Sequence, residues 1–278
     1  MTAAEGFAPA KINLTLHITG QREDGLHLLD SLVMFADVGD SLTVSLSDEP
    51  TLSLNGPMSR DVPADGDNLV MRAAGLMGVA ADISLTKVLP HAAGLGGGSS
   101  DAAATLRLLS RLTEKHIPAD VTVLGADVPV CLGNSAARIQ GIGEMVTAAR
   151  DLPSLHAVLV NPGAPLRTPD VFAALGQKNN TPMPTDIPGS MDAAGFIDWL
   201  RGMRNDLETP AIAMCPIISR ALGALSVTAG CRLARMTGSG SSCFGLYTDE
   251  ETARAAEGRL KEENPGWWIT ATRLNTQP

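Results

Sequence analysis

The stretch PHAAGLGGGSSDAAA, residues 90–104, contains four glycines followed directly by two serines. An Ala- and Leu-rich run from 102 to 112 comes next, and its apolar spacing predicts a helix. We expect Ser99 or Ser100 to cap that helix. A glycine loop at the positive end of a helix dipole presents bare backbone N–H groups, which is typical of a phosphate-binding site.

Two well-known phosphate loops do not fit this stretch. No Gly-Lys-Ser/Thr follows the glycines, so it is not a Walker loop, and Ser99 stands where the dinucleotide-binding fingerprint needs its third glycine. An ordinary glycine-rich turn before a helix is the structural alternative. The pattern favours a phosphate loop of another kind.

Bulk composition narrows the class of protein. The chain has 278 residues, 44% hydrophobic and 18% charged, which is typical of a globular protein with one large domain or two moderate ones. A net charge of −9 argues against nucleic acid as a partner. No apolar run is long enough to span a membrane, and the N-terminus does not resemble a signal peptide, so we expect a cytoplasmic protein without membrane partners.

The four cysteines are widely spaced and include no Cys-x-x-Cys pair. This spacing disfavours a zinc site or a disulfide framework. We expect the cysteines to be buried apolar residues in a reducing compartment.

Hydrophobic patterning before residue 151 predicts strands mixed with two helices. Residues 7–19 alternate polar and apolar side chains, which predicts a strand with one buried face. A turn at 37–40 separates two further strands, and 51–54 is expected to form a hairpin with the second of them. The remaining expected elements are a helix at 69–77 capped by Asn68, a strand at 83–89, the helix after the glycine loop, and a short hairpin at 136–147.

The second half begins with a strand at 156–160 and a helical turn at 170–175. The proline-rich stretch 177–189 is expected to be an exposed loop. Helices at 191–203, 210–225 and 250–263 and strands at 232–236, 243–247 and 268–273 complete the prediction. The order indicates an α+β fold, with a boundary that gives domains 1–153 and 154–278.

Three marked segments call for a common explanation: PAKINL at 9–14, the glycine loop, and MTGSGSS at 236–242. Together they resemble the kinase family named for galactokinase, homoserine kinase, mevalonate kinase and phosphomevalonate kinase. Further segments are similar to those members of the family that act on a cytidine-diphosphate-linked methylerythritol. These segments are ITGQR at 18–22, DGLH at 24–27, LGADVP at 124–129 and NDLE at 205–208.

The resemblance implies a two-domain α+β architecture, with an N-terminal domain like ribosomal protein S5, a C-terminal ferredoxin-like domain, and the active site in the cleft between them. It also implies ATP as the donor, with Mg²⁺ held mostly by phosphate oxygens. The expected nucleotide contacts are Pro90, Gly94, Leu95, Gly96, Gly97, Gly98, Ser99 and Ser100. No residue is assigned to the metal, and Asp101 is open between a metal-linked role and a helix-capping role.

The resemblance also carries over a catalytic pair, Lys11 and Asp127. An alcohol is a poor nucleophile at neutral pH, so Asp127 is the expected general base, and Lys11 is expected to stabilise the developing negative charge. Taken alone, Lys11 would be read as a solvated strand lysine and Asp127 as a turn aspartate.

The expected substrate contacts are Asn13, His27, Thr168 and Phe172. The resemblance implies that His27 hydrogen-bonds the cytosine edge and that Phe172 stacks on the cytosine ring. An aromatic residue precedes the histidine in many relatives, whereas this chain has Leu26 there. A structural histidine and a core phenylalanine are the alternatives for His27 and Phe172.

The resemblance therefore implies transfer of phosphate from ATP to the 2-hydroxyl of the cytidine-diphosphate-linked methylerythritol, in isoprenoid precursor synthesis by the non-mevalonate route. Two alternatives keep the fold: a kinase for mevalonate-type or homoserine-type alcohols, and a nucleotide-binding relative without activity. We expect a monomer or a weak homodimer.

Overall fold

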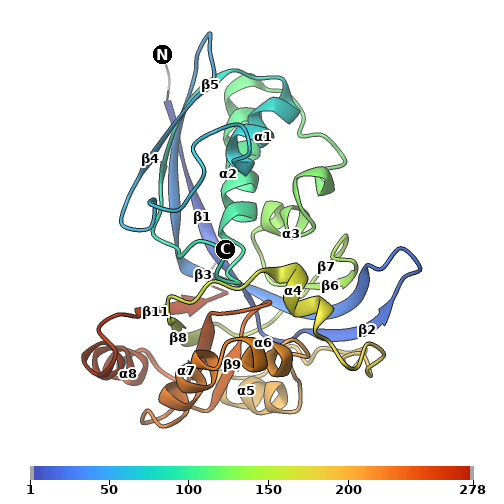
Figure 1. The fold of residues 1–278 in the computed structure, drawn as a ribbon, viewed down its shortest axis with the longest axis vertical. Helices are drawn as coiled ribbons and strands as arrows, with labels where there is room; N and C mark the ends of the chain where they lie inside the picture. The colour runs from blue at the N-terminus through green and yellow to red at the C-terminus, as the bar shows by residue number, and fades with distance from the viewer. Residues whose placement is uncertain (1–2, 276–278) are drawn as a thin grey trace. The chain divides into compact units, whose positions relative to one another are not determined.

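The computed structural model describes residues 3–275. The chain folds into two compact units that are discontinuous in sequence (Figure 1). Unit 1 comprises residues 3–11, 38–91 and 96–134, and unit 2 comprises residues 12–37, 92–95 and 135–275. The predicted domains 1–153 and 154–278 concern continuous segments, and their boundary stays a prediction.

Unit 1 is a sheet with helices on one face (Figure 1). Its strands are β1 (Ala3–Asn13), the second half of β3 (His27–Leu46), β5 (Ala81–Thr86) and β4 (Thr51–Asn55). The helices that face them are α1 (Leu69–Met77), α2 (Gly97–Thr113) and α3 (Val128–Gly133), with a 3-10 turn, η1 (Thr122–Leu124), before α3. The predicted helix 69–77 is confirmed, and the Asn68 side chain caps it by accepting the N–H of Val70.

The predicted turn at 37–40 is wrong, because β3 continues through it without a break. A Cβ on Gly39 would lie 2.3 Å from the carbonyl oxygen of Ala8, so this glycine serves the close approach of two strands rather than a turn. The prediction that residues 51–54 form a hairpin with the strand after residue 40 is wrong as well. Strand β4 pairs in parallel with β5, and it is β5 that pairs antiparallel with β3.

The serine caps expected for the loop helix are also wrong. Helix α2 begins at Gly97, earlier than predicted, so Ser99 and Ser100 lie in its first turn. Its N-cap is Gly96, and no side chain caps the helix. The first N–H groups of α2 therefore have no side-chain cap of their own, which suits a ligand at this end.

Unit 2 contains a four-stranded antiparallel sheet in the order β11 (Trp268–Leu274), β8 (Leu155–Asn161), β10 (Cys243–Tyr247) and β9 (Leu233–Met236). Helices α6 (Glu208–Met214), α7 (Ile217–Ser226) and α8 (Glu250–Glu263) pack with it around one apolar core (Figure 1). The predicted single helix 210–225 is two helices, because Pro216 breaks the pattern between them. The unit also contains helices α4 (Thr168–Ala173) and α5 (Ala193–Arg201).

A second set of antiparallel strands in unit 2 joins β2 (His17–Gln21), the first half of β3, β6 (Ala137–Gly141) and β7 (Met145–Ala148). The hairpin predicted at 136–147 is confirmed by β6 and β7. The strand predicted at 7–19 is interrupted between β1 and β2, and its polar side chains are buried together with the apolar ones. Alternation thus marked the strands correctly, but the expected solvent-facing side is covered.

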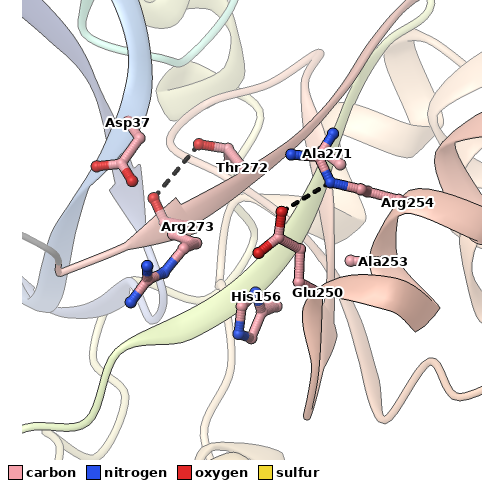
Figure 2. A pocket seen from close by; sticks show the side chains of 8 residues that line it. All are labelled: Asp37, His156, Glu250, Ala253, Arg254, Ala271, Thr272 and Arg273. Carbon is pink, nitrogen blue, oxygen red and sulfur yellow. Dashed lines mark hydrogen bonds and ion pairs between the residues drawn. The ribbon is translucent and has the colours of Figure 1, made fainter.

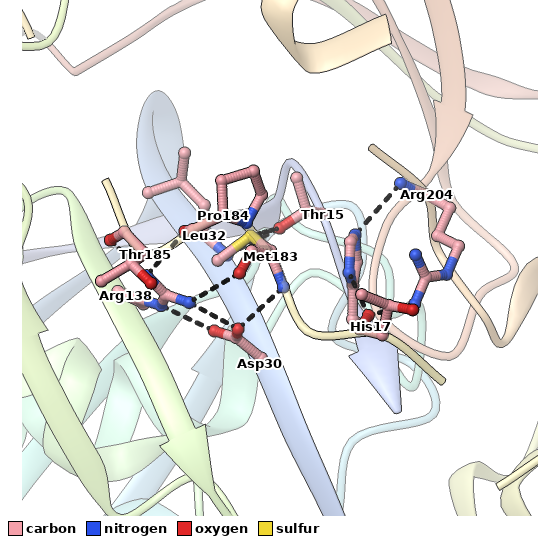
Figure 3. A network of polar contacts seen from close by, with 10 residues as sticks. Thr15, His17, Asp30, Leu32, Arg138, Met183, Pro184, Thr185 and Arg204 are labelled. Atoms are coloured by element: carbon pink, nitrogen blue, oxygen red, sulfur yellow. Dashed lines mark hydrogen bonds and ion pairs between the residues drawn. The ribbon is translucent and has the colours of Figure 1, made fainter. Parts of the chain in front are cut away.

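Polar contacts hold the stretch 177–189 onto these strands (Figure 3). The buried Asp30 accepts two hydrogen bonds from Arg138, at 2.8 and 2.6 Å, and a third from the N–H of Met183. His17 bridges the carbonyl oxygen of Thr181 and the N–H of Arg204. The stretch is free of helix and strand as predicted, but it is not wholly exposed, since Met183 is buried.

The His17 contacts predict an acid-sensitive fold. The ring accepts at Nε2 and donates at Nδ1, so it is neutral, and burial followed by the nearby Arg204 lowers its pKa. A lowered pKa gives stability that is complete above the ordinary imidazole value and is lost as pH falls through the folded value. We expect the free energy of unfolding to fall between pH 7 and pH 5, and to fall less in His17→Asn.

Denaturant titrations across this pH range measure the effect. His116→Asn, at an exposed position in unit 1, is the matched control and should follow the parent chain. Parallel curves for His17→Asn and the parent would contradict the prediction.

Candidate active site

Lys11 and Asp127 meet in unit 1 as an ion pair, with 2.6 Å between Lys11 Nζ and Asp127 Oδ2. Lys11 lies near the end of β1, and Asp127 directly precedes α3. The lysine side chain is 5% exposed and the carboxylate 36%. The predicted pair is therefore in contact, with the ammonium buried and the carboxylate open to a ligand.

The second half of the glycine loop lies beside this pair. A Cβ on Gly96 would lie 3.0 Å from Lys11 Cβ, and a Cβ on Gly125 would lie 3.8 Å from the hydroxyl of Ser99. The uncapped start of α2, the ammonium and the carboxylate are thus neighbours within one compact unit. A helix N-terminus and an ammonium both favour negative charge, so this corner of unit 1 is suited to an anion.

The first half of the loop packs in unit 2 against the other glycine motif, residues 236–242. The N–H of Ser242 donates to the carbonyl oxygen of Ala93, and a Cβ on Gly94 would lie 2.6 Å from the carbonyl oxygen of Thr237. Leu95 is buried, and Pro90, in unit 1, is half-buried. The first half of the glycine loop is therefore in contact with the second glycine motif, although the two segments are far apart in the sequence.

The segment NDLE at 205–208 fastens that second motif. Asn205 Nδ2 donates to the carbonyl oxygens of Met236 and Gly238, at 2.8 and 2.9 Å, and Glu208 Oε2 accepts the N–H of Met236. These side chains fix the turn by hydrogen bonds to its backbone. The segment was singled out in the sequence by its resemblance to relatives, but its hydrogen bonds to the second glycine motif could not be predicted.

The expected substrate residues all lie in unit 2. The rings of His27 and Phe172 are 5.1 Å apart between centroids and tilted by 37°. Burial, followed by the charge of Lys178, lowers the pKa of His27. Its Nε2 is buried without a hydrogen-bond partner, and a neutral imidazole so placed can bond a heterocycle edge.

Asn13 and Thr168 take part in hydrogen bonds beside the second glycine motif. The Asn13 N–H donates to Thr237 Oγ1, and Asn13 Nδ2 donates to Ser31, which leaves Oδ1 buried without a partner. Thr168 Oγ1 lies 2.8 Å from Ser239 Oγ. Leu26 is 48% exposed, so an aliphatic side chain borders His27 where relatives carry an aromatic ring.

Asp101 does not cap α2. It is buried, and its Oδ2 accepts from Lys87 Nζ at 2.6 Å. Lys87 also pairs with Asp40, which is buried as well. Burial first, and then Asp40, raises the pKa of Asp101 to about 7, although Lys87 acts in the opposite direction. Sequence reasoning missed Lys87 and Asp40; the available signals were the one charged residue in the predicted strand 83–89 and an aspartate beside Gly39.

Magnesium beside nucleotide phosphates needs no dedicated cage of protein ligands. Within residues 3–275, no three His, Cys, Asp or Glu side chains gather in a metal-binding group. In kinases Mg²⁺ is held by phosphate oxygens and one or two protein oxygens. The half-buried Ser99 hydroxyl, at the start of α2, fits such a ligand, whereas Ser100 is fully buried.

A hollow elsewhere in unit 2 is lined by charged residues of both signs (Figure 2). Its walls come from β8, β11 and α8, with Asp37 of β3. None of the predicted site residues contributes to it.

Among residues 3–275, no helix is long and apolar enough to cross a bilayer.

Comparison with known proteins agrees with this arrangement. Residues 68–145 match the family model described as the GHMP kinases N terminal domain, and residues 191–266 match GHMP kinases C terminal. This chain belongs to the GHMP kinase family. The predicted boundary near residue 153 falls between the two matched regions.

Full-length relatives narrow the family further. A protein of Cereibacter sphaeroides (strain ATCC 17029 / ATH 2.4.9) named 4-diphosphocytidyl-2-C-methyl-D-erythritol kinase is 51% identical over 97% of this chain and 99% of its own. A protein of the same name from Dinoroseobacter shibae is 51% identical over 97% of this chain and 94% of its own. This GHMP kinase is thus an ATP-dependent small-molecule kinase, as predicted.

Solved structures of GHMP kinases also match this chain. A crystal structure of 4-(cytidine 5'-diphospho)-2C-methyl-D-erythritol kinase matches with a TM-score of 0.78 at 33% identity, covering 99% of this chain and 100% of that one. Homoserine kinase from Cytophaga hutchinsonii matches with a TM-score of 0.71 at 18% identity, over 100% and 96% of the two chains, which speaks for the shared fold. The predicted α+β GHMP kinase architecture is confirmed.

Proposed function

We propose that this kinase transfers the γ-phosphoryl group of ATP to the 2-hydroxyl of 4-diphosphocytidyl-2-C-methyl-D-erythritol, giving the 2-phosphate. Near-full-length relatives of that name support the acceptor. The observation that carries the proposal is the Lys11–Asp127 pair, because it lies beside the uncapped start of α2. This juxtaposition offers a base, a cation and an anion-binding helix end in one compact unit.

The chemistry needs little beyond these groups. Asp127 takes the proton of the acceptor hydroxyl, whose oxygen forms a bond to the γ-phosphorus while the bond to the β–γ bridging oxygen breaks and ADP leaves. The Lys11 ammonium lowers the energy of the developing alkoxide. Backbone N–H groups of 94–98 hold the phosphates. The Ser99 hydroxyl would help phosphate oxygens to hold Mg²⁺, which would supply further neutralisation of the phosphate charge.

Recognition of the cytidine base falls to His27 and Phe172. The contact between the two rings sets a stacking surface beside an imidazole edge with a free nitrogen. Stacking on one aromatic ring contributes about 1–3 kcal/mol per base in proteins that bind single-stranded nucleic acid. The exposed Leu26 supplies an aliphatic surface next to it.

Phe172→Ala tests this base site. Loss of about 1.4 kcal/mol of stacking raises the KM for the acceptor about tenfold, and we expect the KM for ATP to stay within about twofold. Steady-state kinetics with each substrate varied in turn measure both constants. Phe172→Leu keeps apolar bulk without a ring and should resemble Phe172→Ala in the acceptor KM. Equal losses on both substrates would assign Phe172 to the core, where it partly packs.

Turnover with defined acceptors tests the proposed function as a whole. We expect ADP formation and one new phosphate monoester, detected by phosphorus NMR, with the cytidine-linked acceptor. Mevalonate and homoserine should give neither. Turnover with mevalonate or homoserine would favour a different alcohol kinase, and nucleotide binding without any transfer would favour an inactive relative. The cytoplasmic location and a monomeric or weakly dimeric state stay predictions from the sequence.

A further inference from the structure

Three buried charged residues in unit 1 lie beneath the glycine loop and are not used by the chemistry above. Asp40 is on β3, Lys87 immediately follows β5, and Asp101 is near the start of α2. The three are between 0% and 3% exposed. Charges buried so deeply are costly unless they are paired and hydrogen-bonded, so their arrangement calls for an explanation.

The cluster touches the chain on the side where the loop begins. Asp40 Oδ1 accepts the N–H of Val88 at 2.6 Å and the N–H of Leu89 at 2.9 Å. These two residues directly precede Pro90, the first residue of the loop stretch. A carboxylate that accepts two backbone N–H groups fixes the path of that backbone.

The same cluster touches the chain on the side where the loop ends. Lys87 Nζ donates to the other oxygen of Asp40 and, at 2.6 Å, to Asp101 Oδ2. A Cβ on Gly97, the first residue of α2, would lie 3.5 Å from Lys87 Nζ and 3.7 Å from Asp40 Oδ2. The ammonium therefore lies directly under the helix start that is proposed to hold phosphate.

We propose that Asp40, Lys87 and Asp101 act as a clasp that ties both ends of the glycine loop to one buried point and so holds its N–H groups ready for the nucleotide. These are positioning residues, since their hydrogen bonds run to one another and to the backbone N–H groups before the loop. The proposal rests on the proposed function of the loop. Its physical basis is that a glycine-rich segment is entropically expensive to order, and a preformed loop avoids that cost on binding.

Asp40→Asn loosens the clasp at its most connected member. One amide oxygen replaces two carboxylate oxygens, so either the backbone N–H groups or the Lys87 ammonium loses its acceptor. If the loop then keeps its binding conformation in about one tenth of molecules, the Kd for ADP rises about tenfold. The KM for ATP should rise in parallel, and the KM for the acceptor should stay within about twofold.

Two further variants separate an effect on ADP binding from a failure of the protein to fold. Asp101→Asn keeps an acceptor for Lys87, so we expect the Kd for ADP to stay within about threefold. The triple variant Asp40→Asn, Lys87→Met, Asp101→Asn leaves no buried charge unpaired, and we expect it to fold. Because it lacks the tie on the helix side, its Kd for ADP should also rise about tenfold.

Asp30→Asn is the matched control. Asp30 is likewise a buried carboxylate that accepts one backbone N–H and pairs with a cation, but it lies in unit 2 and fastens the stretch 177–189. Its loss should lower the thermal midpoint without raising the Kd for ADP. Calorimetric titration with ADP in the absence of acceptor gives every Kd.

The outcomes separate the clasp from the proposed function. A parent chain that binds no ADP would refute the proposed function, and with it the nucleotide that the clasp serves. A parent that binds ADP, with a folded triple variant that binds it within about twofold of the parent, would overturn the clasp alone. The clasp would also be overturned if Asp40→Asn changed the thermal midpoint but left the KM values for ATP and for the acceptor unchanged. It would likewise be overturned if neither Asp40→Asn nor the triple variant folded. In both cases the cluster would serve the stability of unit 1 as a whole.

Discussion

Asp127→Asn should reduce kcat by roughly two to four powers of ten, because the carboxamide cannot take the proton of the acceptor hydroxyl. The ion pair with Lys11 is lost, but the amide oxygen can still accept a hydrogen bond from the ammonium, so the local structure should persist. The loop and α2 are unchanged, so the Kd for ADP should stay within about threefold. Rapid-quench kinetics and calorimetric titration with ADP measure the two quantities.

Asp120→Asn is the control for this substitution. Asp120 is an exposed loop carboxylate of the same unit that accepts hydrogen bonds from Thr122. We expect its kcat to equal that of the parent. Near-normal turnover in Asp127→Asn would remove Asp127 from the role of base and leave the Lys11 ammonium and the helix end as the main sources of rate.

Gly94→Ala should cause the second largest loss of activity among the substitutions considered. Gly94 has φ of +74°, which disfavours any side chain, and its Cβ would lie 2.6 Å from the carbonyl oxygen of Thr237 and 2.8 Å from that of Gly240. These are backbone atoms, so the loop itself has to shift. A displacement of about 1 Å in a positioning element can cost a factor of about 100 in rate, and we expect kcat/KM for ATP to fall by that order.

The same substitution at Gly223 provides the comparison. Gly223 lies in the interior of α7, and a Cβ there would meet nothing within 4 Å. Gly223→Ala should leave kinetics unchanged and raise the thermal midpoint slightly, since alanine favours a helix by up to about 1 kcal/mol over glycine. Normal ATP kinetics in Gly94→Ala would show that the contact between the two glycine segments is dispensable.

Local chemistry explains which elements could be predicted. Helix α1 begins where an asparagine precedes an apolar run, and α8 carries its own charge pairs four residues apart, such as Arg254 with Glu250. Such signals lie within one turn of the chain, so they survive whatever packs around them. The glycine loop was recognisable for the same reason.

Non-local packing explains what could not be predicted. Gly39 and Asp40 look like turn residues, yet one allows a close strand approach and the other joins a buried charge cluster. The alternating pattern of 7–19 shows two faces, but it does not show that the polar one is covered as well. Strand β4 has no local feature that names β5 as its partner.

The proposed catalytic pair, Lys11 and Asp127, shows both what could be predicted and what could not. The family, the glycine loop and the residue types that phosphoryl transfer needs were all predictable, because short contiguous motifs carry them. Only the folded chain shows that Lys11 and Asp127, 116 positions apart, lie 2.6 Å from each other beside Gly96, and that Lys87 lies beside Gly97. Distance in space depends on how strands and helices pack, and no local pattern encodes it.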